Sequence, residues 1–318
     1  MNRLETHPIR PIRALRELGL SALALNKITN SPELTSREKF FTLQVILGCP
    51  ELSGKTQIVS SVVKYGMFID DYFDTGINRQ KTVELLQTQR AHGQYTGIQI
   101  AEPLRNIEYE LNNRLITVVN QQGRTSEKER DLANIAAWQK TCWDSEVGPL
   151  YVPLNKWTPE LVRKYRELGT FIWSTLFASL APDSKLVLPQ PLRTEYAQKP
   201  EATIEVLHKQ YSEYLPRAGN EGKRALSLAY QMMIVQVYGD VRGREWNMQQ
   251  GIPGFAGIGY PNDVVPEEVL KKEMQHYSNQ AEAMGMNRFK STLFKKLYPE
   301  IYNTYTKIIH SWDAAQKS

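Results

Sequence analysis

Three aspartates, Asp70, Asp71 and Asp74, stand close together directly after the apolar segment 58–69. On a helix, Asp70 and Asp74 lie four residues apart on one face, with Asp71 beside them. Carboxylates arranged in this way can bind magnesium ions and, through the metal, a diphosphate. The same residues also suit the solvated C-terminal end of a helix that stops at a Thr75-Gly76 turn. Both interpretations require segment 58–69 to be helical.

The aspartate-rich motif resembles that of class I terpene synthases. The resemblance implies Asp70, Asp71 and Asp74 as metal ligands, magnesium as cofactor and a prenyl diphosphate as substrate. The second metal motif of that family, Asn/Asp-Asp-x-x-Ser-x-x-x-Glu, has a partial counterpart at 239–247, which keeps Asp240 but lacks the first Asn, the Ser and the final Glu. The C-terminal Arg-Tyr pair of the family is also missing. Part of the ligand set is therefore absent from the sequence, and this enzyme is the alternative interpretation.

The segment Gly48–Thr56 follows an apolar run and ends in Gly-Lys-Thr, as a phosphate-binding P-loop does. A P-loop has four residues between its glycines, so that the backbone amides converge on the phosphates. Here five residues separate Gly48 from Gly54. The nearest acidic partner, Asp70, follows Lys55 by 15 residues, too few for a helix and a returning parallel strand. The spacing argues against a nucleoside triphosphatase.

Two Glu-x-x-His steps, Glu205–His208 and Glu273–His276, have the spacing of ligands in the di-iron centres of ferritin-like helical bundles. Such a centre needs two further glutamates, and Glu167 and Glu245 are the nominees. Glu167 lies far from the end of its predicted helix and fits poorly. Chance pairings are also expected among the five histidines of the chain.

Basic side chains form several short clusters, and the chain carries a formal net charge of +5 with a pI near 9.0. Aromatic residues stand among these clusters, so cations for phosphates lie beside rings on which bases can stack. The alternative is a solvated helical surface with buried aromatics. The candidate RNA-binding residues are Lys156, Arg163, Lys164, Arg166, Arg193, Arg217, Lys223, Arg224, Arg242, Arg244 and Trp246.

Helix-start signals recur along the chain and predict an all-α fold. Thr35 and Ser126 each stand three residues before a glutamate, which is the pattern of the capping box. Thr158 precedes a proline, and Asn220 precedes another helical segment. The stretch 251–266 is too rich in glycine and proline for a helix and predicts a long structured loop.

Breaks in the helical pattern predict two helical lobes with an extended N-terminal arm. Proline and arginine punctuate residues 1–34, which we expect to form the arm. Residues 35–180 then form an N-terminal helical lobe, residues 181–200 a proline-containing linker, and residues 201–318 a C-terminal helical lobe.

The apolar runs fall short of the roughly 20 residues needed to cross a bilayer, so no membrane partner is expected. The N-terminus shows no secretory signal. Cys49 and Cys142, the two cysteines of the chain, fit reduced thiols in a cytosol-like compartment. These features predict a cytoplasmic protein.

A two-lobed helical body with a terminal arm and a basic excess resembles, in layout, the nucleoproteins and helical coat proteins of RNA viruses. The resemblance implies that single-stranded RNA is clamped in a cationic groove independently of sequence, and that the arm mediates self-association. We therefore expect an RNA-binding nucleoprotein or coat-like protein that oligomerises on RNA, needs no cofactor and occurs in the host cytoplasm and the virion. A magnesium-dependent terpene synthase-like enzyme is the alternative.

Overall fold

The computed structural model describes residues 27, 28, 30–74, 84, 102–122, 125–189, 199 and 202–285. Within them there is no strand, only one isolated bridge between Pro253 and Ile258. The predicted all-α fold is confirmed. The helices are α3 (Ser36–Gly48), α4 (Thr56–Asp74), α6 (Glu102–Gln122), α7 (Lys128–Val147), α8 (Pro159–Ser179), α10 (Thr203–Arg217), α11 (Gly219–Arg242), α12 (Arg244–Gln249) and α13 (Pro266–Ala283), with 3-10 turns η1 (Pro50–Lys55), η2 (Gly148–Tyr151) and η3 (Leu154–Lys156).

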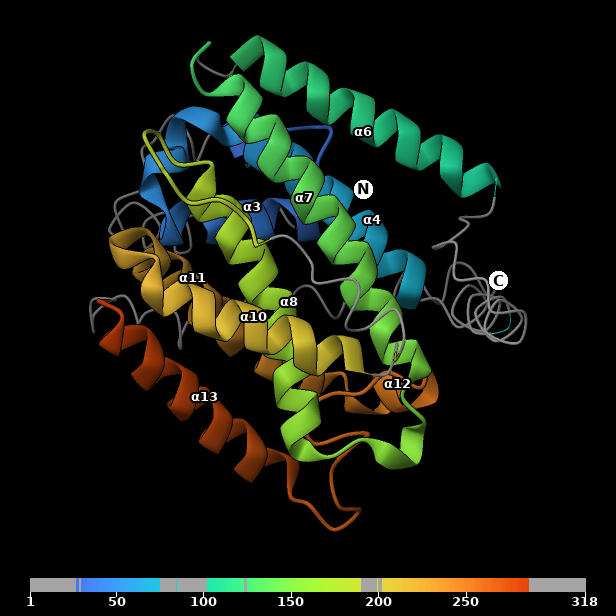
Figure 1. Cartoon of the computed structure of the whole chain (residues 1–318). Coiled ribbons are helices and arrows are strands. Elements are labelled where there is room, and N and C mark those ends of the chain that lie inside the picture. The colour runs from blue at the N-terminus through green and yellow to red at the C-terminus, as the bar shows by residue number, and fades with distance from the viewer. Residues whose placement is uncertain are drawn as a thin grey trace.

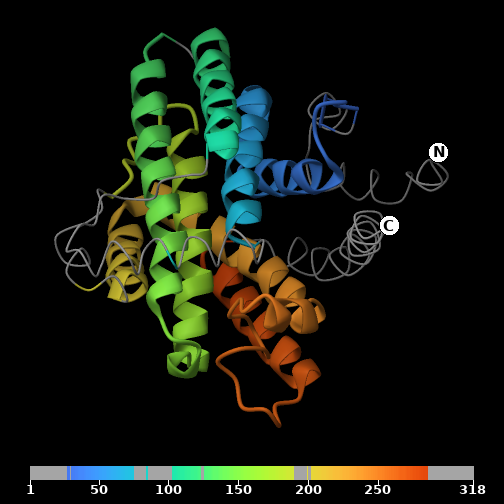
Figure 2. The ribbon, with the colours of Figure 1, turned by 90° about the vertical axis from the view of Figure 1, so that its right-hand side faces the viewer.

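Helix α8 lies at the centre of this assembly, between α6 and α13 at opposite edges (Figure 1). It packs against α7, α10 and α11, and α11 packs in turn against α13 and α3. Helix α4 packs against α3, α6 and α7, and a second view shows α7 and α8 side by side (Figure 2). Among the described helices, none combines the length and the apolar character that a membrane crossing requires.

Two predicted helix caps are present. The hydroxyl of Thr35 accepts the backbone N–H of Glu38 at 3.2 Å, and the Glu38 carboxylate accepts the Thr35 N–H at 2.7 Å. The hydroxyl of Thr158 accepts the N–H of Leu161 at 3.2 Å. These side chains satisfy amides that have no partner inside a helix, and so fix where α3 and α8 begin.

Two other predicted helix starts are corrected. Helix α7 has Glu127, rather than Ser126, in the N-cap position. Glu127 is turned inward by an ion pair with Lys55, in which Nζ and Oε2 are 2.7 Å apart. Helix α11 begins at Gly219, so Asn220 lies inside its first turn. Tertiary contacts, which sequence spacing does not contain, account for the shift at α7.

One main hydrophobic core includes buried side chains from both predicted lobes, 35–180 and 201–318. Helices approach closely at Gly66 in α4, where a Cβ would lie 2.1 Å from the Trp173 side chain and 3.2 Å from that of Trp138. Glycine therefore lets α4 reach these two rings, which pack edge to face at 5.3 Å. The division into arm, lobes and linker stays a prediction, and the arm lies outside the described residues except for 27, 28 and 30–34.

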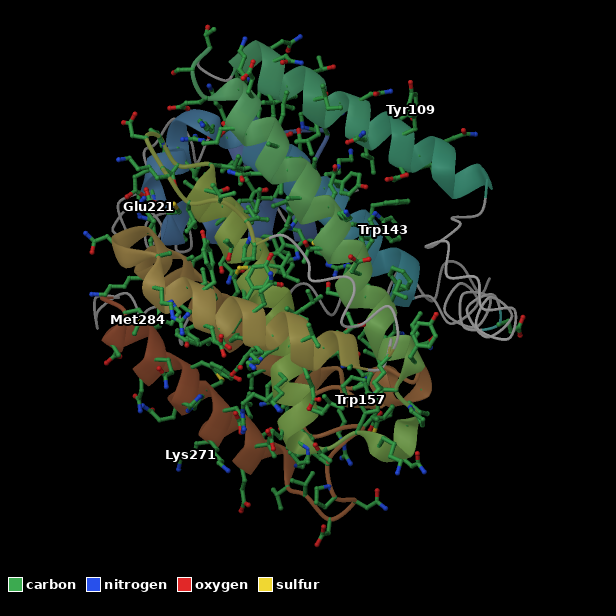
Figure 3. All side chains as sticks on the ribbon, in the orientation of Figure 1. Tyr109, Trp143, Trp157, Glu221, Lys271 and Met284 are labelled. Atoms are coloured by element: carbon green, nitrogen blue, oxygen red, sulfur yellow. The ribbon has the colours of Figure 1, made fainter. Side chains whose placement is uncertain are left out.

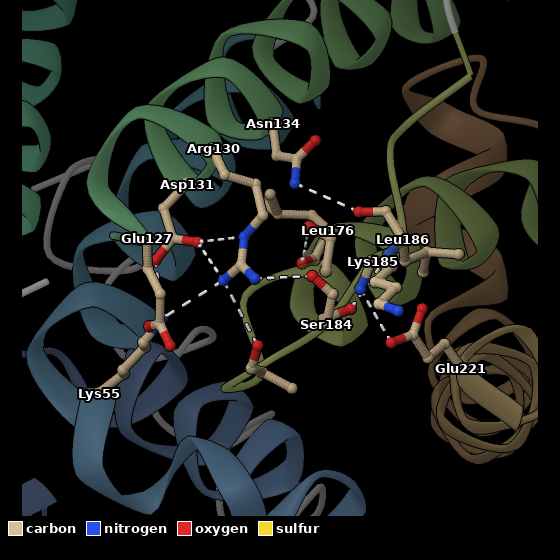
Figure 4. A network of polar contacts seen from close by, with 12 residues as sticks. Lys55, Glu127, Arg130, Asp131, Asn134, Leu176, Ser184, Lys185, Leu186 and Glu221 are labelled. Atoms are coloured by element: carbon tan, nitrogen blue, oxygen red, sulfur yellow. Dashed lines mark hydrogen bonds and ion pairs between the residues drawn. The ribbon is translucent and has the colours of Figure 1, made fainter. Parts of the chain in front are cut away.

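A network of buried charges joins η1, the start of α7 and the turn after α8 (Figure 4). The Lys55 ammonium lies 2.7 Å from a carboxylate oxygen of Glu127 and 2.7 Å from one of Asp131. Arg130 binds the second Asp131 oxygen at 2.8 Å and donates to the Ser184 carbonyl at 2.6 Å. Two cations thus balance two carboxylates. Because Lys55 is held by these acids, the Gly48–Thr56 segment does not offer its lysine to a phosphate in this structure.

Replacing Lys55 by alanine would leave Glu127 and Asp131, which are 5% and 0% exposed, without their buried cation. We expect Lys55→Ala to lower the free energy of unfolding by about 3–5 kcal/mol, measured by urea denaturation followed by circular dichroism. Lys164→Ala, which breaks a partly exposed pair with Glu160, is the matched control and should have a much smaller effect. Equal effects of the two substitutions would contradict this account.

Both cysteines are buried free thiols. Burial, followed by the nearby Glu51 carboxylate, raises the pKa of Cys49 to about 12. Burial raises the pKa of Cys142 as well. Since the thiolate is the reactive form, neither side chain has the lowered pKa of a nucleophile.

At pH 8 we therefore expect neither cysteine of the folded protein to react with a thiol reagent such as dithionitrobenzoate. Raising the pKa of Cys49 above its usual value depletes the thiolate at this pH, and burial denies access to the reagent. Both thiols of the chain should react once it is unfolded in guanidinium chloride. Rapid labelling of the native protein would contradict the prediction.

Candidate nucleic-acid interface

Two arginines of α8 are bound by buried carboxylates of other helices. Arg163 donates to Glu273 of α13 from Nη2 at 2.7 Å and from Nε at 3.3 Å. Arg166 donates to Asp240 of α11 from Nε at 2.8 Å and from Nη2 at 2.9 Å. The hydrogen bonds to Glu273 raise the pKa of Arg163, so its charge is fixed. Both arginines thus join α8 to its neighbours through two-point contacts.

Glu167 of α8 lies beside this pair. One of its oxygens is 2.7 Å from Nε2 of His208 in α10, and the other accepts the hydroxyl of Tyr277 in α13 at 2.9 Å. Burial, and then the Glu167 charge, raises the pKa of Tyr277 well above its usual value. Phe171 stacks on the His208 ring at 5.7 Å. Arg163, Arg166 and Glu167 therefore connect α8 to α10, α11 and α13.

Two other candidate metal ligands are engaged in ion pairs. Glu205 lies 3.6 Å from Lys164, and Glu273 is bound by Arg163. Across the residues that the structure describes, no three His, Cys, Asp or Glu side chains converge as a metal site would require. These residues of the Glu-x-x-His steps thus contribute to helix packing. Glu167, whose position in the sequence fits a di-iron site poorly, does contact His208. Its other oxygen accepts the hydroxyl of Tyr277, which takes the place of a further metal ligand.

The aspartate-rich motif ends α4, where Asp70 forms an ion pair with Arg37 of α3. The side chains of Asp71 and Asp74 lie outside the described part of the structure. Asp240, the residue retained from the second metal motif of terpene synthases, forms an ion pair with Arg166. Magnesium binding at Asp70, Asp71 and Asp74 stays a prediction.

Residues 250–265, between α12 and α13, form the predicted structured loop, called here the glycine-rich loop. It leaves α12 at Gly251, whose φ of +69° favours glycine. The Ile252 N–H then bonds back to the Asn247 carbonyl at 2.8 Å. Farther on, Gly257 N–H donates to Gly254 at 3.0 Å, so the loop turns tightly upon itself. Its path is fixed by internal hydrogen bonds.

The glycine-rich loop also carries buried side chains. Phe255 and Ala256 are completely buried, and the Phe255 ring lies 6.4 Å from that of Tyr277. Ile258 and Tyr260 pack against a second, smaller apolar cluster, which consists of Val152, Trp157, Val162, Tyr165 and Ile204. The loop therefore fills the corner between α12, α13 and the start of α8.

Two segments that carry candidate cations contact this loop at positions two residues apart. At Gly259, which has φ of +97°, a Cβ would lie 3.4 Å from the Trp157 Cβ, next to Lys156 in η3. At Gly257, a Cβ would lie 3.6 Å from Met248 and 3.9 Å from Arg244, both in α12. The loop thus brings Lys156 and Arg244 to one corner of the molecule, although 88 positions separate them (244 minus 156).

Five of the candidate RNA-binding cations have their charges balanced by carboxylates. They are Arg163, paired with Glu273; Lys164, with Glu160 and Glu205; Arg166, with Asp240; Arg224, with Glu51; and Arg242, with Glu267. Arg166 is also largely buried. These pairs lower the positive potential that a phosphate would meet, so RNA contact through these five residues stays a prediction.

The remaining candidates differ in their surroundings. Lys156, Arg217 and Lys223 are exposed, and within the described residues no carboxylate pairs with them or with Arg244. The Nε of Arg244 is buried and finds no hydrogen-bond partner in that part of the chain. Arg193 lies outside the described residues.

Trp246, in α12, keeps 37% of its surface exposed, whereas the other described tryptophans are buried or half-buried. Its neighbour Met248 is exposed as well. Trp157, which contacts the glycine-rich loop at Gly259, is by contrast buried. Lys156, Arg244 and Trp246 are called here the loop-flank surface. It combines two cations without acidic partners and one accessible aromatic ring.

Sequence reasoning missed the carboxylates that hold α8. Asp240 was considered only for its partial match to a metal motif, and Glu273 and Glu167 only as iron ligands. The available signal was that Arg163, Arg166 and Glu167 share one face of a predicted helix that leads into the largely apolar segment 171–180, so this face is expected to meet other helices. Charges on such a face require buried partners.

In comparisons with known proteins, no family model, curated protein or solved structure matches this chain.

Arg166 is the best test of whether a candidate cation serves the fold. Arg166→Lys should lower the free energy of unfolding by about 1–3 kcal/mol, because an ammonium cannot reproduce the two-point contact with buried Asp240. Chemical denaturation measures the effect. Arg242→Lys, at the exposed pair with Glu267, is the control and should change stability little. An Arg166→Lys protein as stable as the control would show that the contact is unimportant to the fold.

Proposed function

We propose that this chain binds single-stranded RNA independently of sequence, at the loop-flank surface. Lys156 and Arg244 contact phosphates, and Trp246 provides a face for base stacking. The observation that carries the proposal is that these cations lack acidic partners among the described residues and lie beside the same loop, and that α12, which holds Arg244, also holds the most exposed of the described tryptophans. Cations beside an accessible ring suit a single strand, whose bases are free to stack.

The proposal extends to assembly. Two cations make few phosphate contacts per molecule, so useful affinity at cellular salt requires several copies on one strand. We therefore propose that the chain oligomerises on RNA as a nucleoprotein or coat-like protein, with residues 1–34 mediating self-association. Size-exclusion chromatography with absorbance at 260 and 280 nm tests this: large RNA-containing particles support it, and an RNA-free monomer that stays monomeric with added RNA opposes it.

Lys156→Ala combined with Arg244→Ala should weaken binding of a fluorescein-labelled 20-nucleotide poly-U RNA, measured by fluorescence anisotropy. The slope of log affinity against log salt should flatten by roughly 0.7 for each lost phosphate contact. Lys271→Ala combined with Lys272→Ala removes the same charge from α13 and is the control; Lys271 lies at the outer edge of that helix, away from Trp157 (Figure 3). Identical affinities and slopes for the two double variants would refute the proposed site.

Trp246→Ala should weaken RNA binding relative to the unmodified chain without changing the salt slope, because stacking contributes about 1–3 kcal/mol per base and involves no counterions. Trp246→Phe keeps an aromatic face and should restore most of the affinity. If neither substitution changes the affinity for poly-U RNA at low salt, Trp246 is not part of the site.

A further inference from the structure

The Asp240 carboxylate joins three separate elements. Both of its oxygens are bound by Arg166 of α8, at 2.8 and 2.9 Å. Gln236, one turn earlier on α11, donates to one oxygen at 2.9 Å. The other oxygen accepts the backbone N–H of Phe255, in the glycine-rich loop, at 3.1 Å. Four hydrogen bonds therefore hold a side chain that is only 3% exposed.

Asp240 binds the backbone of the glycine-rich loop and lies close to Gly254. A Cβ at Gly254 would lie 3.0 Å from an Asp240 carboxylate oxygen and 3.3 Å from the Asn247 amide nitrogen. Two residues later, Ala256 has φ of +61°, a conformation that costs a non-glycine residue about 1–2 kcal/mol. The loop keeps this conformation because its surroundings hold it on both sides of the strained residue.

Charge balance also suits this position. Burial raises the pKa of Asp240, and Arg166, the Phe255 N–H and Gln236 oppose that shift. Arg166 supplies a full positive charge against the carboxylate. The contact therefore adds no net negative charge beneath a surface that is to bind phosphates.

We propose that Asp240 is a positioning residue, which fixes the glycine-rich loop against α11 and thereby holds the two sides of the loop-flank surface in a geometry that binds a single-stranded polyanion. Asp240 does not touch the RNA. The role in binding rests on the proposed function, whereas the anchoring of the loop does not.

Gly254→Ala tests the anchor without removing any charge or hydrogen-bonding group. Because four hydrogen bonds fix the Asp240 carboxylate, the added methyl group must displace the loop. Gly257→Ala is the matched control, since a Cβ there meets only ordinary contacts, at 3.5 Å or more. Neither glycine has a positive φ, so alanine suits the backbone at both positions.

The first readout is fluorine NMR of the full chain labelled with 5-fluorotryptophan, with each resonance assigned by a Trp→Phe substitution. Gly254→Ala should shift or broaden the resonances of Trp157, which contacts the loop at Gly259, and of Trp246, in the helix that precedes the loop. It should leave those of Trp138 and Trp173, which pack near Gly66, unchanged. Gly257→Ala should leave Trp157, Trp138 and Trp173 unchanged. Unshifted Trp157 and Trp246 in Gly254→Ala, or equal shifts at all positions, would overturn the anchor.

The second readout is affinity for the labelled poly-U RNA. Gly254→Ala should weaken binding about tenfold, because the displaced loop must be ordered again when RNA binds, and Gly257→Ala should bind as the unmodified chain does. If the Trp157 and Trp246 resonances shift but the affinity for RNA does not change, the role in binding is overturned. If the unmodified chain binds no RNA, while the Trp157 and Trp246 resonances shift in Gly254→Ala, the anchor is supported and the proposed function is overturned.

A second variant covers failure of Gly254→Ala to fold. Arg166→Met combined with Asp240→Leu replaces the buried ion pair by apolar side chains, an exchange that proteins often tolerate. It leaves the Phe255 N–H without its acceptor. The same selective shift of Trp157 and Trp246, with the same loss of RNA affinity, is expected, and its absence in the folded double variant would overturn the proposal.

Discussion

The packing of this chain depends on how α8 accommodates charges inside the assembly. Arg163, Arg166 and Glu167 fall on one face of α8, and that face meets α10, α11 and α13. A buried charge without a partner is strongly unfavourable, so the three neighbouring helices must each bring a complementary group. They do so with His208, Asp240, and Glu273 together with Tyr277. The same contacts specify which helix lies beside which.

This constraint explains why basic clusters in the sequence do not map directly onto a basic surface. Arg163 and Glu273 are 110 positions apart, and Arg166 and Asp240 are 74 apart, so their pairing follows from tertiary structure alone. Counting cations along the chain therefore overestimates the charge presented to a polyanion. Lys156 and Arg244 differ from the five paired cations, as Arg217 and Lys223 also do, in that no described carboxylate pairs with them, which is a property of the folded surroundings. Only Lys156 and Arg244 also lie beside the glycine-rich loop among the contacts seen at its glycines.

Features that depend on interactions between residues close in the sequence could be predicted, whereas features that depend on distant residues could not. The caps at Thr35 and Thr158 involve atoms three residues apart, and both were predicted correctly. The cap at Ser126 was predicted wrongly because Lys55, 72 positions from Glu127 (127 minus 55), decides how α7 begins. Residues 251–266 were recognisable as a structured loop from their glycines and prolines. Its anchor was not, because a backbone N–H binding a distant carboxylate leaves no trace in composition.

The interior pairs and the proposed surface are parts of one arrangement. Arg166 joins α8 to Asp240, Asp240 holds the backbone of the glycine-rich loop, and that loop separates Lys156 from Arg244. A rigid loop reduces the ordering that must accompany binding, so few contacts can suffice for each molecule. With few phosphate contacts per copy, affinity for a long strand then grows with the number of copies that bind side by side. On the proposed function, the buried ion pair of α8 thus contributes to RNA binding through geometry, whereas the charge that meets the phosphates comes from residues left unpaired at the surface.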